Sequence, residues 1–274
     1  MSHDKHVTYI SYLKVDELLE LQEPLSDGPE HDELLFITIH QVYELWFKQI
    51  LHELAATQRS LEAGDTHRSL ALLGRVRTIM KTCVSQLDIL ETMTPLQFNS
   101  FRSRLSSASG FQSAQFRELE AVLGRRDQAG ANASEGTGMR MAEHLMPGSA
   151  ARARVEAAML RPSLWDSALK YFNSRAKLPE SVIQRDVKTA WEPNDEVQQV
   201  LIELHRNDPE ASMLGEALVD LDEGLQEWRY RHVKMVERTI GRKIGTGGSS
   251  GAGYLASTLF NPVFPDLWAI RSQF

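Results

Sequence analysis

Two histidines occupy positions where the hydrophobic pattern of a helix requires an apolar side chain. In the first stretch, apolar residues recur at alternating steps of four and three, and the next step falls on His232. The residues of this helix face are Leu214, Leu218, Leu221, Leu225 and Trp228. In a second stretch, His40 follows Phe36 by four residues and precedes Tyr43 by three. An imidazole can ligate a metal or exchange a proton near neutral pH, or it can be a core residue bonded to a carbonyl.

An arginine and a glycine-rich loop could bind the polar end of a small molecule. Arg102 stands one turn from Phe98 on an otherwise apolar face, where it either extends to solvent or binds an anion. In residues 245–253 (GTGGSSGAG), the glycines allow close backbone approach to a ligand and Thr246 offers a hydroxyl. The loop follows a helix and holds no lysine, which disfavours nucleotide binding. A flexible linker is the alternative interpretation.

The spacing of the histidines and the single cysteine limits the kinds of metal site. No histidine has a glutamate three residues before it, and there is no His-Glu-x-x-His sequence. Cys83 alone cannot form an internal disulfide, a Cys-x-x-Cys pair or a covalent haem attachment, and we expect it to be buried in a helix. Haem needs only one axial protein ligand. Two isolated histidines on facing helices are compatible with that requirement.

Helical periodicity runs through the chain, and strand-like alternation is absent, so we predict an all-α fold. Long helices are expected near 31–62 and 66–92, with shorter ones after Thr94, at 111–123 and at 197–207. Capping boxes are predicted at Thr94 with Gln97 and at Ser109 with Gln112. Short helices near 152–160 and 162–172 are assigned to a lid or peripheral subdomain. Residues 125–150 are predicted to be a flexible excursion from a single domain spanning 1–274.

The net charge and the hydropathy of the chain limit which binding partners and which cellular location are expected. The formal charge is −7, from 30 basic and 37 acidic residues, which makes nucleic acid an unexpected partner. The apolar run at 34–39 is far too short to span a membrane, and charges occupy the N-terminus where a signal peptide is hydrophobic, so a cytoplasmic protein is expected. Tyr9, Tyr12 and Leu13 form an apolar arm that could pack on a neighbouring subunit.

Five sequence blocks resemble the tryptophan 2,3-dioxygenase family in order and approximate spacing. The blocks are Leu34-Leu35-Phe36-Ile37 with His40-Gln41 and Glu44-Leu45-Trp46, then Phe101-Arg102, Ser109-Gly110-Phe111-Gln112-Ser113, Trp228-Arg229-Tyr230-Arg231-His232, and residues 245–251. The resemblance extends from Tyr9 to about Trp268 and weakens between about 125 and 193.

The resemblance implies a helical bundle that encloses non-covalent b-type haem, ferrous in the active form. It implies a homotetramer that uses O2 to cleave the indole C2–C3 bond of L-tryptophan, giving N-formyl-L-kynurenine. His232 would be the iron ligand, and His40 would be catalytic, bonding the indole N–H. The other implied contacts are Phe36, Phe98 and Leu105 around the ring, Arg102 and Thr246 at the charged end, Ser109, Gly110 and Gly245 at the haem, and Tyr9, Tyr12 and Leu13 reaching a neighbouring subunit's site.

One position departs from part of the family. Phe98 stands where some bacterial relatives have tyrosine, which removes a hydroxyl and keeps an aromatic wall. A methylated tryptophan or indole therefore remains an alternative substrate. A helical binding protein without catalytic activity is the alternative from another functional class.

Overall fold

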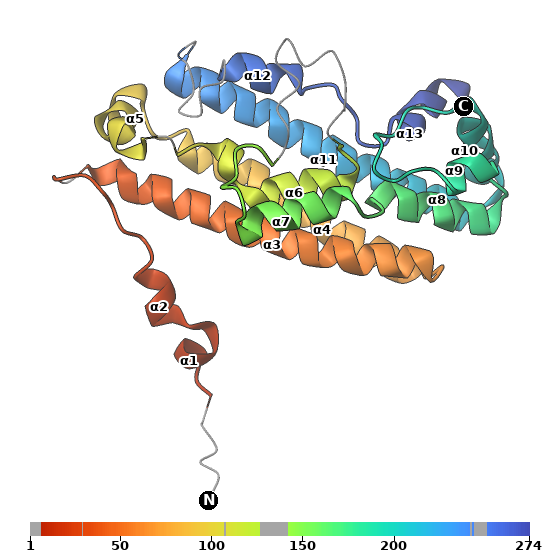
Figure 1. Ribbon diagram of the computed structural model, residues 1–274, viewed down its shortest axis with the longest axis horizontal. Coiled ribbons are helices and arrows are strands. Elements are labelled where there is room, and N and C mark those ends of the chain that lie inside the picture. Colours follow the sequence, from red (N-terminus) through yellow and green to blue (C-terminus); the bar gives the residue numbers. More distant parts are fainter. Residues whose placement is uncertain (1–6, 29, 107, 127–141, 242, 244–250) are drawn as a thin grey trace, which may run out of the picture.

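Three long helices lie side by side and form the body of the molecule (Figure 1). The computed structural model describes residues 7–28, 30–106, 108–126, 142–241, 243 and 251–274. The long helices are α3 (His31–Glu62), α4 (Thr66–Leu90) and α11 (Pro209–Ile240), and α4 packs against both of the others. Gly64, with φ of +72°, makes the tight turn between α3 and α4 that a residue with a Cβ would resist. The two long helices predicted in the first third of the chain are confirmed.

The helix starts that follow α4 match the sequence only in part. Thr94 and Gln97 form the predicted capping box at α5 (Pro95–Arg102), which continues into η1 (Ser103–Leu105). Ser109 and Gln112 also cap each other, but they enclose only the single turn η2 (Gly110–Gln112). The chain then extends at Ser113, with ψ of 96°, and α6 (Ala114–Leu123) starts there. The continuous helix predicted for 111–123 is therefore wrong, because Ser113 begins a second helix.

Among the helices after α6, the one predicted near residues 162–172 lies in the core and not at the periphery. The elements are α7 (Ala150–Met159), α8 (Leu164–Arg175), α9 (Glu180–Ile183), α10 (Asp195–Asn207), α12 (Ala252–Ser257), α13 (Pro265–Ala269) and η3 (Ile270–Gln273). Helix α8 packs on α3, and its Trp165 and Phe172 are both 1% exposed. It belongs to the main core rather than to a peripheral subdomain. Every regular element in the described part of the chain is a helix, which confirms the all-α fold.

A buried carboxylate on α11 holds the segment that leads into α13. Asp222, 1% exposed, accepts hydrogen bonds from the backbone N–H groups of Val263 and Phe264 at 2.8 and 3.1 Å. It also accepts one from Trp268 Nε1 at 2.9 Å. The chain that follows the glycine-rich loop is thereby fastened to the helix that carries His232.

Replacing Asp222 with alanine is expected to destabilise the protein by about 3 kcal/mol, because one buried and two partly buried donors lose their acceptor. Thermal and urea unfolding monitored by circular dichroism measure the change. Asp220→Ala is the matched control, since Asp220 pairs with Arg77 at the surface and should cost less than about 1 kcal/mol. Equal losses in the two variants would contradict the anchoring role of Asp222.

The N-terminal arm stands away from the body (Figure 1). It consists of α1 (Tyr9–Leu13) and α2 (Val15–Leu19), neither of which has a buried residue. Tyr9 and Tyr12 are 75% and 76% exposed. In the described part of the chain, no helix is both long and apolar enough to cross a membrane.

Candidate functional site

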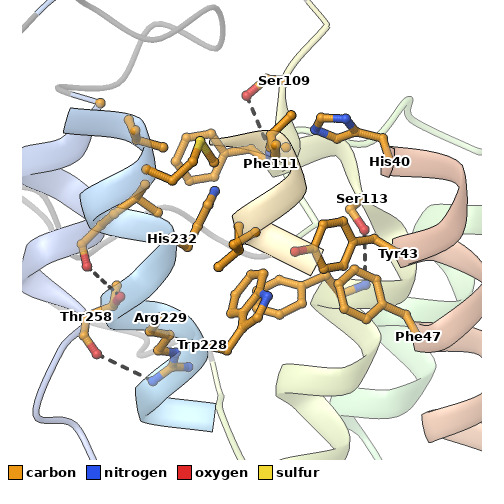
Figure 2. Close-up of a pocket in the computed structure, with 18 of the residues that line it drawn as sticks. His40, Tyr43, Phe47, Ser109, Phe111, Ser113, Trp228, Arg229, His232 and Thr258 are labelled. Atoms are coloured by element: carbon orange, nitrogen blue, oxygen red, sulfur yellow. Dashed lines mark hydrogen bonds between the residues drawn. The ribbon is translucent and has the colours of Figure 1, made fainter. Parts of the chain in front are cut away.

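A cavity of about 270 Å³ lies between α3 and α11. Helix α4 contributes Leu87 and Leu90 to its lining, and α5, η2, α6 and α12 contribute further residues. Most of the lining is apolar, and the larger side chains are Phe47, Phe98, Phe111, Phe116, Trp228 and Met235. Figure 2 shows His40 and His232 reaching this space from the two different helices. The fold therefore brings together two histidines that are 192 positions apart in the sequence.

His232 lies on the α11 side with its ring stacked on Trp228, one turn earlier in the helix. The ring centroids are 5.1 Å apart and the planes are inclined by 24°. Burial lowers the pKa of His232 to about 4, and the nearby His40 and Arg117 add to the effect. The residue as a whole is half-buried, and it lines the cavity. The imidazole is neutral at pH 7, the form in which it can ligate a metal.

His40 lies on the α3 side, and its backbone contact determines its tautomer. Nδ1 lies 2.7 Å from the carbonyl oxygen of Phe36, which can only accept, so Nδ1 carries the hydrogen. In the neutral ring, Nε2 is then an acceptor. The side chain is exposed, which corrects the expectation of a buried histidine. The surrounding protein nevertheless desolvates the imidazole, which lowers the pKa of His40. The hydrogen bond to the Phe36 carbonyl and the negative charge of Glu44 act in the opposite direction and raise it.

The predicted aromatic wall is only partly at the cavity surface. Phe98 lines the cavity. Phe36 packs behind it, with ring centroids 4.1 Å from His40 and 5.8 Å from Phe98. Leu105 is partly buried against the main core and is not among the lining residues. The first two rings and His40 form one cluster, whereas Leu105 stands outside it.

The remaining predicted contacts fall into three groups. Arg102, Ser109 and Gly110 line the cavity. Gly245 and Thr246 lie outside the described residues. The three arm residues named in the sequence analysis are exposed on α1 and do not line this chain's own cavity. The prediction that they serve a neighbouring subunit stays a prediction.

A charged cluster at the cavity was missed by sequence reasoning. The buried carboxylate of Glu120 is contacted by Arg117 at 2.8 Å, Arg125 at 2.7 Å and Arg229 at 3.4 Å. Burial alone would raise the pKa of Glu120, but the three guanidinium groups hold it below its usual value. The spacing of Arg117 and Glu120 on one helix face was visible in the sequence. Their convergence with Arg229, 109 positions after Glu120, was not.

These features fit a flat, apolar, metal-bearing macrocycle with acidic groups. The walls are aromatic and aliphatic, and a neutral imidazole can supply one axial bond to a metal already held by the macrocycle. Three arginines facing one glutamate leave a local surplus of positive charge, which suits carboxylates on a ligand. The donor set and the lining are therefore compatible with haem.

The chain is similar over nearly its whole length to known proteins of one family. The family model for tryptophan 2,3-dioxygenase matches residues 2–199 and 197–274. The tryptophan 2,3-dioxygenase of Anaeromyxobacter sp. (strain K) is 56% identical over 270 residues, covering 98% of this chain and 97% of the relative. That of Herpetosiphon aurantiacus is also 56% identical over 270 residues, covering 97% and 98%. The protein of the same name from Caulobacter vibrioides is 43% identical over 272 residues.

Proposed function

Because this chain belongs to the tryptophan 2,3-dioxygenase family, we propose that its cavity holds haem on His232 and L-tryptophan against His40. The chain is a haem-dependent dioxygenase that cleaves the indole C2–C3 bond of L-tryptophan with O2 to give N-formyl-L-kynurenine. Both oxygen atoms enter the product. The observation that carries the assignment of residues is the pair of cavity histidines, one with its acceptor nitrogen determined by the Phe36 carbonyl.

Haem, proposed to be of the b type and ferrous in the active form, would supply the iron at which dioxygen is activated. The chain's contribution on this side is His232, which is neutral at pH 7 and needs to lose no proton before it ligates. Stacking on Trp228 restricts rotation of the imidazole ring. Ser109, Gly110 and Gly245 are proposed to contact the macrocycle, and the first two line the cavity.

The substrate is held at both ends. His40 Nε2 accepts a hydrogen bond from the indole N–H, while Phe98 and Phe36 support the aromatic ring. Arg102 offers a planar fork to the carboxylate, and Thr246 is proposed to bind the same charged end. With both ends held, the C2–C3 bond keeps one position in the cavity, and positioning of this kind can supply several kcal/mol of the barrier reduction.

The direct test is an absorbance spectrum followed by product analysis. Purified, reduced protein should show a haem Soret band and convert L-tryptophan to N-formylkynurenine. With isotopically labelled O2, mass spectrometry should find two labelled oxygen atoms in the product. Haem binding without turnover of L-tryptophan would contradict the substrate assignment. A single labelled atom would contradict dioxygenation.

The pH dependence of kcat/KM should follow the protonation of His40. Its pKa lies below 6.5, and only the neutral ring offers Nε2 as an acceptor. Activity should therefore be constant above pH 7 and fall as the pH drops below 6.5. His40→Ala should lower kcat/KM about tenfold or more and abolish this acidic fall. An unchanged acidic fall in the variant would assign the titration to another group.

A second substrate tests the same contact. With 1-methyltryptophan, which lacks the indole N–H, the activities of His40→Ala and of the wild type should differ little.

We further propose a homotetramer in which Tyr9, Tyr12 and Leu13 enter a neighbouring subunit's cavity. The proposal is supported by the arm, whose apolar side chains find no cover on their own body. Light scattering should give the mass of four chains, and a variant lacking residues 1–14 should show weaker tryptophan binding. The cytoplasmic location stays a prediction.

A further inference from the structure

Glu44 lies one helical turn after His40 on α3 and lines the same cavity. Its carboxylate accepts two hydrogen bonds from the start of α6. Ser113 Oγ donates to Oε1 at 2.5 Å, and Gln115 Nε2 donates to Oε2 at 2.8 Å. Gln115 Nε2 also donates to the backbone carbonyl of Glu44 at 2.8 Å. One residue of α3 thus holds both polar side chains that begin α6.

The segment held by Glu44 is itself a wall of the cavity. Ser109, Gly110, Phe111 and Ser113 all line it. The segment 109–113 is closed by its own backbone, since the N–H groups of Gln112 and Ser113 donate to the carbonyls of Ser109 and Gly110 at 2.9 and 3.2 Å. It is a short 3₁₀ turn with its own hydrogen bonds. Its position therefore depends on how its ends are held.

Ser113 is the end at which this wall is held. Its hydroxyl oxygen accepts from the Phe116 N–H at 3.2 Å, which caps α6, while its hydrogen is donated to Glu44. Ser113 lies on the side of the cavity formed by α3 (Figure 2). The separation of η2 from α6, unexpected from the sequence, places a serine hydroxyl where α3 can bind it.

The partners of Glu44 indicate a hydrogen-bonding role rather than charge neutralisation. Its two oxygens are bound by a hydroxyl and an amide. Two of the buried glutamates are instead neutralised by arginines, since Glu53 is paired with Arg75 and Glu120 with three arginines. A third, Glu33, resembles Glu44, because it accepts hydrogen bonds from backbone N–H groups and has no ion pair among the described residues. Removing the charge of Glu44 while keeping its shape should therefore be tolerated.

We propose that Glu44 is a positioning residue for the dioxygenase reaction: it clamps the wall 109–113 to the helix that carries His40, and so sets the space in which the indole is held. The inference rests on the proposed function, because the position of this wall matters to catalysis only if the substrate lies between the wall and His40. Glu44 itself need not touch the substrate.

The test compares Glu44→Ala, Gln115→Ala, the double variant and Glu44→Gln in the haem-loaded protein. Glu44→Ala should raise KM for L-tryptophan about tenfold or more, since misplacement by about 1 Å is costly. Gln115→Ala should have a smaller effect and add nothing in the double variant, because both residues act through one contact. Glu44→Gln should stay near wild type, since its amide can accept from Gln115 and donate to Ser113.

A structural measurement separates this inference from the proposed function. Hydrogen exchange read by mass spectrometry should be faster in peptides covering 109–119 in Glu44→Ala than in the wild type, whether or not tryptophan is turned over. Glu53→Ala is the matched control, a buried glutamate of the same helix about 13 Å away along its axis. It should leave both KM and exchange at 109–119 unchanged.

Two sets of results would overturn the clamp. One is additive increases in KM from Glu44→Ala and Gln115→Ala, or an equal increase in Glu53→Ala. The other is unchanged exchange at 109–119 in Glu44→Ala. A wild-type protein that fails to oxidise L-tryptophan would instead refute the proposed function, and the exchange comparison would still decide the clamp.

Discussion

Replacing His232 with alanine is expected to give a folded protein that has lost the proposed bond between this residue and haem iron. The ring borders the cavity and stacks on Trp228, while the main core beneath α11 is built from other side chains. Turnover of L-tryptophan should fall by at least about a thousandfold, which corresponds to about 4 kcal/mol of activation free energy. Haem titration of the apoprotein, read at the Soret band, measures the loss of affinity directly.

Two controls make the His232 result specific. His205→Ala changes a histidine of α10 that bonds Glu216 at 2.7 Å and does not line the cavity, so haem binding should be preserved. Imidazole added to His232→Gly should restore part of the wild-type spectrum, because it can occupy the space of the missing ring. A normal Soret band and normal turnover in His232→Ala would show that another residue ligates the iron.

Replacing Arg102 with alanine should raise KM for L-tryptophan by about 10- to 150-fold, since a hydrogen bond to a charged group contributes about 1.5–3 kcal/mol. The Arg102 side chain lines the cavity from the last residue of α5. The capping box of Thr94 and Gln97 determines where this helix begins. Arg102→Lys should recover little of the loss, because an ammonium cannot reproduce the planar fork. Steady-state kinetics with haem content normalised by absorbance provide the measurement.

The substrate itself supplies the sharpest control for Arg102. Tryptamine lacks the carboxylate, so its poor turnover should be equal in the wild type and in Arg102→Ala. Arg104→Ala is the matched protein control, because Arg104 is a nearby arginine paired with Asp27 at the surface. If Arg102→Ala impaired tryptamine as strongly as tryptophan, Arg102 would act on the fold of the cavity rather than on the carboxylate.

Local patterns in the sequence predicted most of the helices and the types of residue at the site. Helical spacing of apolar side chains and caps at Thr94 depend on residues three or four apart, so they are legible in one stretch. The position of His232 on an apolar helix face could also be recognised from residues three or four positions away, and it marked this histidine as a candidate site residue. Local reasoning failed at Ser113, where the helix breaks and restarts, because the serine's second partner is Glu44, 69 positions earlier.

Burial and convergence of charge were decided by tertiary structure. Trp165 belongs to the core because α8 packs on α3. The sequence of α8 by itself does not distinguish a core helix from a peripheral one. His40 is open to the cavity although its neighbours in sequence are apolar. Glu120 collects three arginines, one of them from α11. The sequence alone determined which side chains could carry the chemistry and that helices would hold them. Only packing determined their exposure, tautomer and partners, because these depend on atoms contributed by distant parts of the chain.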